Sequence, residues 1–210
     1  MMIHALASGT PKNISNGEHI YTSGIGKDRV EKLTVEIDQI KGDCVENLAF
    51  HGGVDRVICV YPFEHYAFWE EVLGSKLRLP AFGENMTVSG MTEREIYIGD
   101  IFQIGTSIVQ VSQGRIPCST ISKFNQQPSL LNEIIREGYT GYFFRVIQKG
   151  IIDIYSSITL LERDEQSLSL LRANQLFFHE KENLNELKKL SNLSGLATDW
   201  KEKVRRKMKK

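Results

Sequence analysis

The segment VSQGRIPC, residues 111–118, follows an alternating run of apolar and polar residues from Phe102, which predicts a strand. A glycine, an arginine and a proline then end this strand and carry Cys118 out of it. The Arg115 guanidinium favours the ionised form of a nearby thiol, and a loop would expose that thiol. A lone cysteine is more often a small, inert apolar residue. Cys118 is therefore a candidate functional thiol whose role depends on the rest of the chain.

Length and composition describe an ordinary globular protein. The chain has 210 residues, enough for one domain with a small appendage, and 41% of them are hydrophobic. Lysine plus arginine number 26 and aspartate plus glutamate number 26, so the net charge is zero and does not predict a nucleic-acid partner. No apolar run is long enough for a membrane helix, so we expect no membrane association.

The cysteines and the N-terminus indicate the compartment. Cys44, Cys59 and Cys118 are an odd set without a CxxC pair, which argues against a disulfide framework or a zinc finger. The first residues, MMIHALA, do not resemble a signal peptide. We therefore expect a cytoplasmic protein with reduced thiols.

The fold class is expected to be mainly β. Short strands separated by glycine turns, with short helices from Pro62 and Pro128, predict a mostly antiparallel barrel over residues 1–161. Residues 162–210 have the spacing of a small three-helix unit, with Asp164, Asn183 and Ser194 near the helix starts. Seven of the last ten residues are basic, which we interpret as a solvated helix terminus rather than a nucleic-acid site.

Further candidate residues lie in loops. His51-Gly52-Gly53 introduces an acid/base group into a tight turn, followed by Asp55 and Arg56. Lys27 lies in a glycine-flanked segment, and Asn85 follows the Phe82-Gly83-Glu84 turn, where it binds a ligand or caps the turn. Cys59, inside an apolar strand, is expected to be core packing, and Asp100 a turn residue.

The order of these signals resembles one family. The motifs are HGGVDR (51–56), YPFEHY (61–66), FGEN (82–85), IGD (98–100), SQGRIPC (112–118) and GYTGY (138–142), with Arg145 after them. Together they resemble the MOSC domain, the molybdenum cofactor sulfurase C-terminal domain, in a bacterial branch that carries a C-terminal three-helix extension. Among the relatives that this resemblance implies are bacterial proteins that detoxify hydroxylaminopurine. The relatives often have proline where this chain has Gly114, so we expect a more flexible cysteine loop here.

The resemblance implies a β-barrel like the insert domain of pyruvate kinase and a molybdenum cofactor (molybdopterin). In the family, the residue matching Cys118 ligates molybdenum or carries a persulfide. By this resemblance, we expect Arg115, Lys27 and Arg145 to hold the pterin phosphate, with Asn85 and Asp55 also in the binding set. His51 would be a proton donor, or a hydrogen-bond partner of the substrate or the cofactor. The family is also associated with pyridoxal phosphate, but the sequence has no lysine context for a Schiff base, so we assign none.

Several functions remain open. The first is a reductase of small N-hydroxylated compounds that takes electrons from a partner protein, because no flavin or iron–sulfur motif is visible. The second is a sulfur carrier that holds a persulfide on Cys118 without turnover. An interaction protein led by the three-helix unit, and a cysteine hydrolase using Cys118 and His51, are further alternatives. The sequence decides neither the substrate nor the oligomeric state, nor whether the chain is an enzyme.

Overall fold

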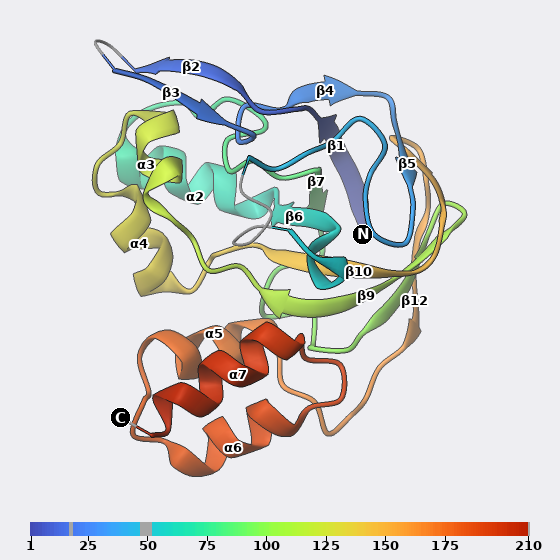
Figure 1. Ribbon diagram of the computed structural model, residues 1–210, viewed down its shortest axis with the longest axis vertical. Helices are drawn as coiled ribbons and strands as arrows, with labels where there is room; N and C mark the ends of the chain where they lie inside the picture. The colour runs from blue at the N-terminus through green and yellow to red at the C-terminus, as the bar shows by residue number, and fades with distance from the viewer. Residues whose placement is uncertain (17–18, 47–51, 210) are drawn as a thin grey trace.

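The architecture is known from a computed structural model, which describes residues 1–16, 19–46 and 52–209 (Figure 1). The elements, in chain order, are β1 (Met2–Ser8), β2 (Lys12–Asn16), β3 (His19–Ser23), β4 (Asp28–Val30), β5 (Lys32–Val35), the 3-10 helix η1 (Val54–Arg56), β6 (Ile58–Pro62), α2 (Glu64–Leu73), β7 (Met86–Ser89), β8 (Ile101–Ile104), β9 (Ser107–Gly114), α3 (Ser119–Asn125), α4 (Leu130–Glu137), β10 (Tyr142–Gln148), β11 (Gly150–Asp153), β12 (Ile158–Glu162), α5 (Leu170–Phe178), α6 (Leu184–Asn192) and α7 (Thr198–Lys207).

The main sheet confirms the expected mainly-β, barrel-type class. Its strand order is β12-β8-β9-β10-β6-β7-β1-β4, antiparallel throughout except for the parallel pair β6–β7. The β5–β11 pair continues the wall beyond this sheet, because the Ile154 N–H donates to the Glu31 carbonyl and the Thr106 N–H to the Ile151 carbonyl, both at 3.1 Å. The β2–β3 hairpin stands apart at one end (Figure 1).

Two groups of helices cover the barrel. Figure 1 shows α2, α3 and α4 together on one side, and α5, α6 and α7 together below β9. The first group packs with Tyr61 and Phe82 around the buried Trp69. The second group belongs to the core of the barrel itself, because Trp200 and Leu176 lie in one apolar cluster with Val111 and Phe144. The expected three-helix unit is thus confirmed and shares the main core.

Some helix boundaries differ from the expectation. The polar residues after Cys118 form α3, which the sequence did not predict, because Ile121 alone is deeply buried there and leaves little apolar periodicity. Asp164 does not begin a helix: its Oδ1 accepts the Gln166 N–H at 2.9 Å in a turn, and Ser169 caps α5 instead. Asn183 caps α6 as expected.

Two more details bear on the predictions. Pro62 ends β6 rather than beginning α2, with the Phe63 N–H donating to the Val88 carbonyl at 2.7 Å. Asp100 is structural as predicted, since its carboxylate accepts hydrogen bonds from the Tyr97 N–H and from Arg163. Across the described parts of the chain, no helix combines the length and apolar character needed to cross a bilayer.

Candidate functional site

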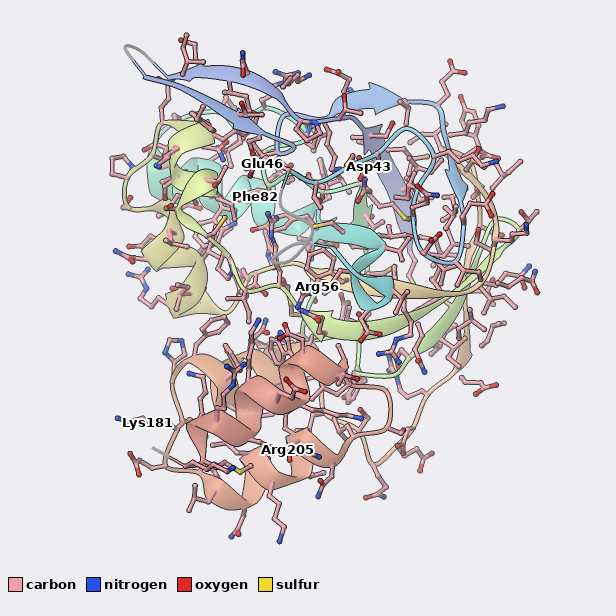
Figure 2. All side chains as sticks on the ribbon, in the orientation of Figure 1. Asp43, Glu46, Arg56, Phe82, Lys181 and Arg205 are labelled. Carbon is pink, nitrogen blue, oxygen red and sulfur yellow. The ribbon has the colours of Figure 1, made fainter. Side chains whose placement is uncertain are left out.

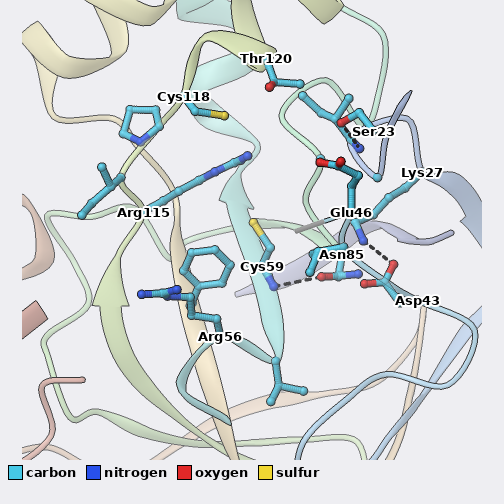
Figure 3. A pocket seen from close by; sticks show the side chains of 18 of the residues that line it. Ser23, Lys27, Asp43, Glu46, Arg56, Cys59, Asn85, Arg115, Cys118 and Thr120 are labelled. Carbon is cyan, nitrogen blue, oxygen red and sulfur yellow. Dashed lines mark hydrogen bonds and ion pairs between the residues drawn. The ribbon is translucent and has the colours of Figure 1, made fainter. Parts of the chain in front are cut away.

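A cavity of about 520 Å³ opens where the end of β9, the start of β6 and helix α7 meet (Figure 3). Its volume lies in the usual range for small-molecule and cofactor sites. Four of the predicted site residues line it: Cys118, Arg115, Lys27 and Asn85. Two of these four residues, Arg115 and Cys118, come from the motif at residues 112–118, and the other two from separate loops.

Cys118 lies at the point where the chain leaves β9 and enters α3. Its backbone is extended, with φ −125° and ψ 167°, and its carbonyl accepts the Ile121 N–H at 3.1 Å in the first turn of the helix. The half-buried side chain carries a thiol in no disulfide and points toward the cavity (Figure 3). The loop thus presents the thiol as the sequence predicted.

Arg115 is fixed by two backbone carbonyls. Its backbone N–H donates to the Gly141 carbonyl at 3.0 Å, and its side-chain Nη1 donates to the Phe82 carbonyl. Gly83, next to Phe82, turns the chain with φ 73°, at a place where a Cβ would lie 3.0 Å from Ile25. Within residues 1–16, 19–46 and 52–209, no carboxylate pairs with Arg115, so its positive charge is directed at the cavity uncompensated.

Lys27 is the second cation from the predicted set. It is only 4% exposed and forms an ion pair with Asp43, whose Oδ1 also accepts the Gly9 N–H at 3.0 Å. A buried lysine needs such a partner, because desolvation of an unpaired ammonium is costly. Lys27 therefore shapes the cavity wall while its own charge is balanced.

Asn85 and Cys59 form the cavity floor beside Lys27 (Figure 3). The Asn85 Oδ1 accepts the Cys59 N–H at 3.0 Å and its Nδ2 donates to the Ala7 carbonyl at 3.2 Å, so the amide joins β6 to β1. Cys59 is 7% exposed, which agrees with core packing, yet its side chain also borders the cavity. Burial raises the pKa of the Cys59 thiol and so favours its protonated form, although the charge of Arg115 opposes this shift.

Among the described residues, the predicted site residues Asp55 and Arg145 are not found in the cavity wall. Asp55 and Arg145 pair with each other, Oδ1 to Nε at 2.8 Å, away from it. Asp55 Oδ2 also accepts the Thr198 N–H at 3.3 Å, so this carboxylate anchors the start of α7, and Arg145 Nη1 donates to Gln110 at 3.0 Å. Both residues thus make contacts within the protein, and their predicted contact with the cofactor stays a prediction. His51 lies outside the described residues, and its role stays a prediction.

The prediction missed the contribution of the three-helix unit. Lys203 on α7 lines the cavity, and so does Arg56, which lies between the barrel and the three-helix unit (Figure 2) and binds Asp199 of α7. From the sequence alone, the basic C-terminal run is interpreted as a solvated helix terminus. A pattern that indicates an ion pair within α7 is the spacing of Asp199 and Lys203, which lie one helical turn apart. Which side of α7 would face the barrel could not be read from that spacing alone.

The expectation of a loose loop at Gly114 was wrong. Gly114 is buried and lies within β9, against α5 and α7. A Cβ at this position would lie 2.2 Å from Asn174 Oδ1 and 3.3 Å from Trp200 Cη2. The glycine therefore allows the three-helix unit to pack closely behind the segment that presents Arg115 and Cys118.

Two thiols border the cavity, and that of Cys118 is the less buried of the two. Within the described residues, no three His, Cys, Asp or Glu side chains are grouped as metal ligands. A metal bound here by Cys118 would therefore bring most of its own ligands, as a metal held by an organic cofactor does. A soft thiolate and nearby cations that suit a phosphate form a donor set that fits a molybdenum cofactor.

Comparisons with known proteins agree along nearly the whole chain. The family model for the MOSC domain matches residues 47–159, and that for the YiiM-like 3-alpha helix domain matches residues 168–210. The chain is 35% identical to YflK of Bacillus subtilis (strain 168) over 197 residues, 93% of this chain and 89% of that one. It is 31% identical over 147 residues to a protein named Reductase in Gibberella moniliformis (strain M3125 / FGSC 7600), 68% of this chain but 26% of that longer one. The structure of YiiM from Geobacillus stearothermophilus is similar with a TM-score of 0.84 and 34% identity, covering 99% of this chain and 98% of that one.

Proposed function

The chain belongs to the MOSC domain family, and on this premise we propose that it binds a molybdenum cofactor in the cavity and reduces N-hydroxylated bases, with Cys118 as a ligand of the metal. The observation that carries the proposal is that the Cys118 thiol and the Arg115 guanidinium line the same cavity. The likeness to a fungal protein named Reductase supports the reaction class.

The proposed reaction removes an oxygen atom from nitrogen. An N–OH group takes up two electrons and two protons, the N–O bond breaks, and an N–H group and water remain. The bound cofactor would supply two-electron redox chemistry. The protein's own contribution is binding and orientation: Arg115 would hold the cofactor phosphate by charge-assisted hydrogen bonds, while Asn85 keeps the floor of the cavity rigid.

Cys118 is favoured over Cys59 as the ligand. A thiol must lose its proton to bind a metal. Burial raises the pKa of the Cys59 thiol, and Cys59 is buried, whereas Cys118 is only half-buried and can be reached from the cavity. Cys59 would then act as a packing residue of the cavity floor.

The test is metal analysis of purified full-length protein from a host that makes the cofactor. We expect wild type to carry molybdenum and Cys118→Ser to lose it. Cys44→Ser is the matched control, because Cys44 is exposed and does not line the cavity, and it should retain the metal.

Two outcomes would contradict the proposal. One is wild-type protein without molybdenum from that host. The other is a molybdenum content unchanged by Cys118→Ser. If wild type instead has an intact mass one sulfur atom higher, removable by reductant and absent from Cys118→Ser, the sulfur-carrier alternative replaces the reductase.

A further inference from the structure

The outer wall of the cavity is built across the two units of the molecule. Arg56, at the end of η1, is 10% exposed, and Lys203 lies one turn along α7 from Asp199. Arg56 Nη2 and Lys203 Nζ both bond the same atom, Oδ2 of Asp199, the lysine at 2.7 Å. These three side chains therefore carry one net positive charge on a wall that borders the cavity.

A second positive centre lies near Cys118. Arg115 borders the cavity there, whereas the charge of Lys27 is balanced by Asp43. In Figure 3, Arg56 and Cys118 lie at opposite ends of the view, and Glu46, an exposed acid that also lines the cavity, lies beside Lys27 and Ser23. The cavity thus presents two separate positive centres, at Arg115 and at Arg56–Lys203.

Two separated positive centres suit two anionic groups. In the proposed function the cofactor phosphate occupies the centre at Arg115, which leaves the outer pair without an assigned ligand. We propose that Arg56 and Lys203 form a phosphate subsite for the substrate, which is then an N-hydroxylated nucleotide rather than a free base. The assignment of this subsite to a substrate and the identity of the base rest on the proposed function, whereas the binding of a phosphate group at Arg56 and Lys203 does not.

Asp199 is a positioning residue in this arrangement. Its carboxylate brings a guanidinium from the barrel and an ammonium from the helix to one point. Lys203 is 35% exposed on its side chain, so its pair with Asp199 is weak and can exchange for a phosphate oxygen at little cost. A phosphate carries several strong acceptor oxygens and can bind both cations at once.

The inference is tested by binding rather than turnover. Adenosine and adenosine 5′-monophosphate, the matching product-type nucleoside and nucleotide, are titrated by calorimetry into the full-length protein as isolated. We expect the nucleotide to bind about ten-fold more tightly, as one charge-assisted hydrogen bond gives. Lys203→Met should remove most of this preference and leave adenosine binding unchanged.

Two controls separate this result from a general charge effect. Lys201→Met removes a cation from the same helix whose Nζ donates to the Ser194 carbonyl and which does not line the cavity, and it should keep the preference. Inorganic phosphate is the third probe. If it binds as tightly as the nucleotide, the site takes phosphate alone and the claim about the substrate is wrong.

Equal affinities for the two adenosine compounds, or a preference that Lys203→Met leaves intact, would also overturn the inference. Failure of the proposed function has a different signature. Protein without molybdenum that still prefers the nucleotide loses the reductase assignment and keeps the subsite. Protein that carries molybdenum on Cys118 but shows no preference keeps the reductase and loses the subsite.

Discussion

Glu84 shows how a buried residue beside the site sets a pH dependence. Its side chain is fully buried, and its described hydrogen-bond partners are neutral: the hydroxyls of Tyr66 and Thr87 and the N–H of Phe82. Burial raises the pKa of this carboxyl, although the hydrogen bonds oppose the shift. The folded protein therefore holds a proton on Glu84 at pH values where the unfolded chain has released it.

The sign of the effect on stability follows from proton linkage. Above the unfolded pKa of about 4.3 the unfolded chain binds fewer protons than the folded one, so the free energy of unfolding falls as pH rises toward the folded pKa. Glu84→Gln removes this titration. We expect the free energy of unfolding of wild type, minus that of Glu84→Gln, to decrease between about pH 4 and pH 7 in urea titrations.

Glu71→Gln is the control for this measurement, because Glu71 is exposed on the same side of the molecule, in α2. Its difference from wild type should not vary in the same way. A flat difference for Glu84→Gln across the pH range would show that burial does not raise the pKa of Glu84.

At the level of single residues, the chemical type of a side chain was a better guide to the cavity than its position near a motif. Cys118 and Arg115 were found because a thiol, a guanidinium and a strand end occur together in eight residues. The structure pairs Asp55 with Arg145 outside the cavity wall. The sequence did not predict this pair, because a charged residue near a motif looks the same whether it binds a ligand or a partner side chain. Cys59 borders the cavity through the pleat of β6, which an apolar run does not reveal.

Among the elements, the contact of β9 with α5 and α7 has the tightest fit near the site. Gly114 has no room for a Cβ, because Asn174 Oδ1 would lie 2.2 Å from it. We expect Gly114→Ala to lower the free energy of unfolding by about 1–3 kcal/mol through overpacking. Urea unfolding of the variant measures this loss.

A double-mutant cycle identifies the cause. Asn174→Ala by itself costs stability, since Asn174 Nδ2 donates to the Gly138 carbonyl at 2.8 Å and to Thr140 Oγ1 at 3.0 Å. In that background, Gly114→Ala should cost less than it does in wild type. Gly9→Ala is the matched control, because its Cβ would make ordinary contact at 3.5 Å, and it should change stability by less than about 1 kcal/mol. Equal costs of Gly114→Ala in both backgrounds would contradict the packing argument.

Element prediction succeeded where periodicity was strong. The helices after Pro128 and Asn183 have regular apolar spacing, and α4 and α6 begin within two residues of those positions. The prediction failed where a local side-chain hydrogen bond competes with helix capping. At Asp164 the carboxylate accepts the Gln166 N–H in a turn instead of capping a helix. The pairing of strands, including the parallel pair β6–β7, depends on contacts between distant segments that no local pattern contains.

For the whole molecule, the decisive fact is that the barrel and the three-helix unit share one apolar core. Leu170, Leu176 and Trp200 pack in the same cluster as Val109 and Phe144. The backbone joins the units as well, since the Ala197 N–H donates to the Ser112 carbonyl at 2.9 Å. The resemblance to a family with a helical extension predicted that both parts exist, but not that the extension completes the cavity wall.

A shared core predicts a single cooperative unfolding transition, because neither unit can lose its partner without exposing buried apolar surface. The two tryptophans of the chain provide a reporter in each part: Trp69 in α2 against the barrel, and Trp200 in α7. Trp200→Phe leaves Trp69 as the only tryptophan, and Trp69→Phe leaves Trp200. Although each substitution lowers stability, the fluorescence midpoint in urea should coincide with the far-UV circular dichroism midpoint within each variant. If the Trp200 fluorescence changes at a lower urea concentration than the dichroism does, the three-helix unit unfolds before the barrel. The contact between Arg56 of the barrel and Asp199 of α7 would then break before the barrel unfolds.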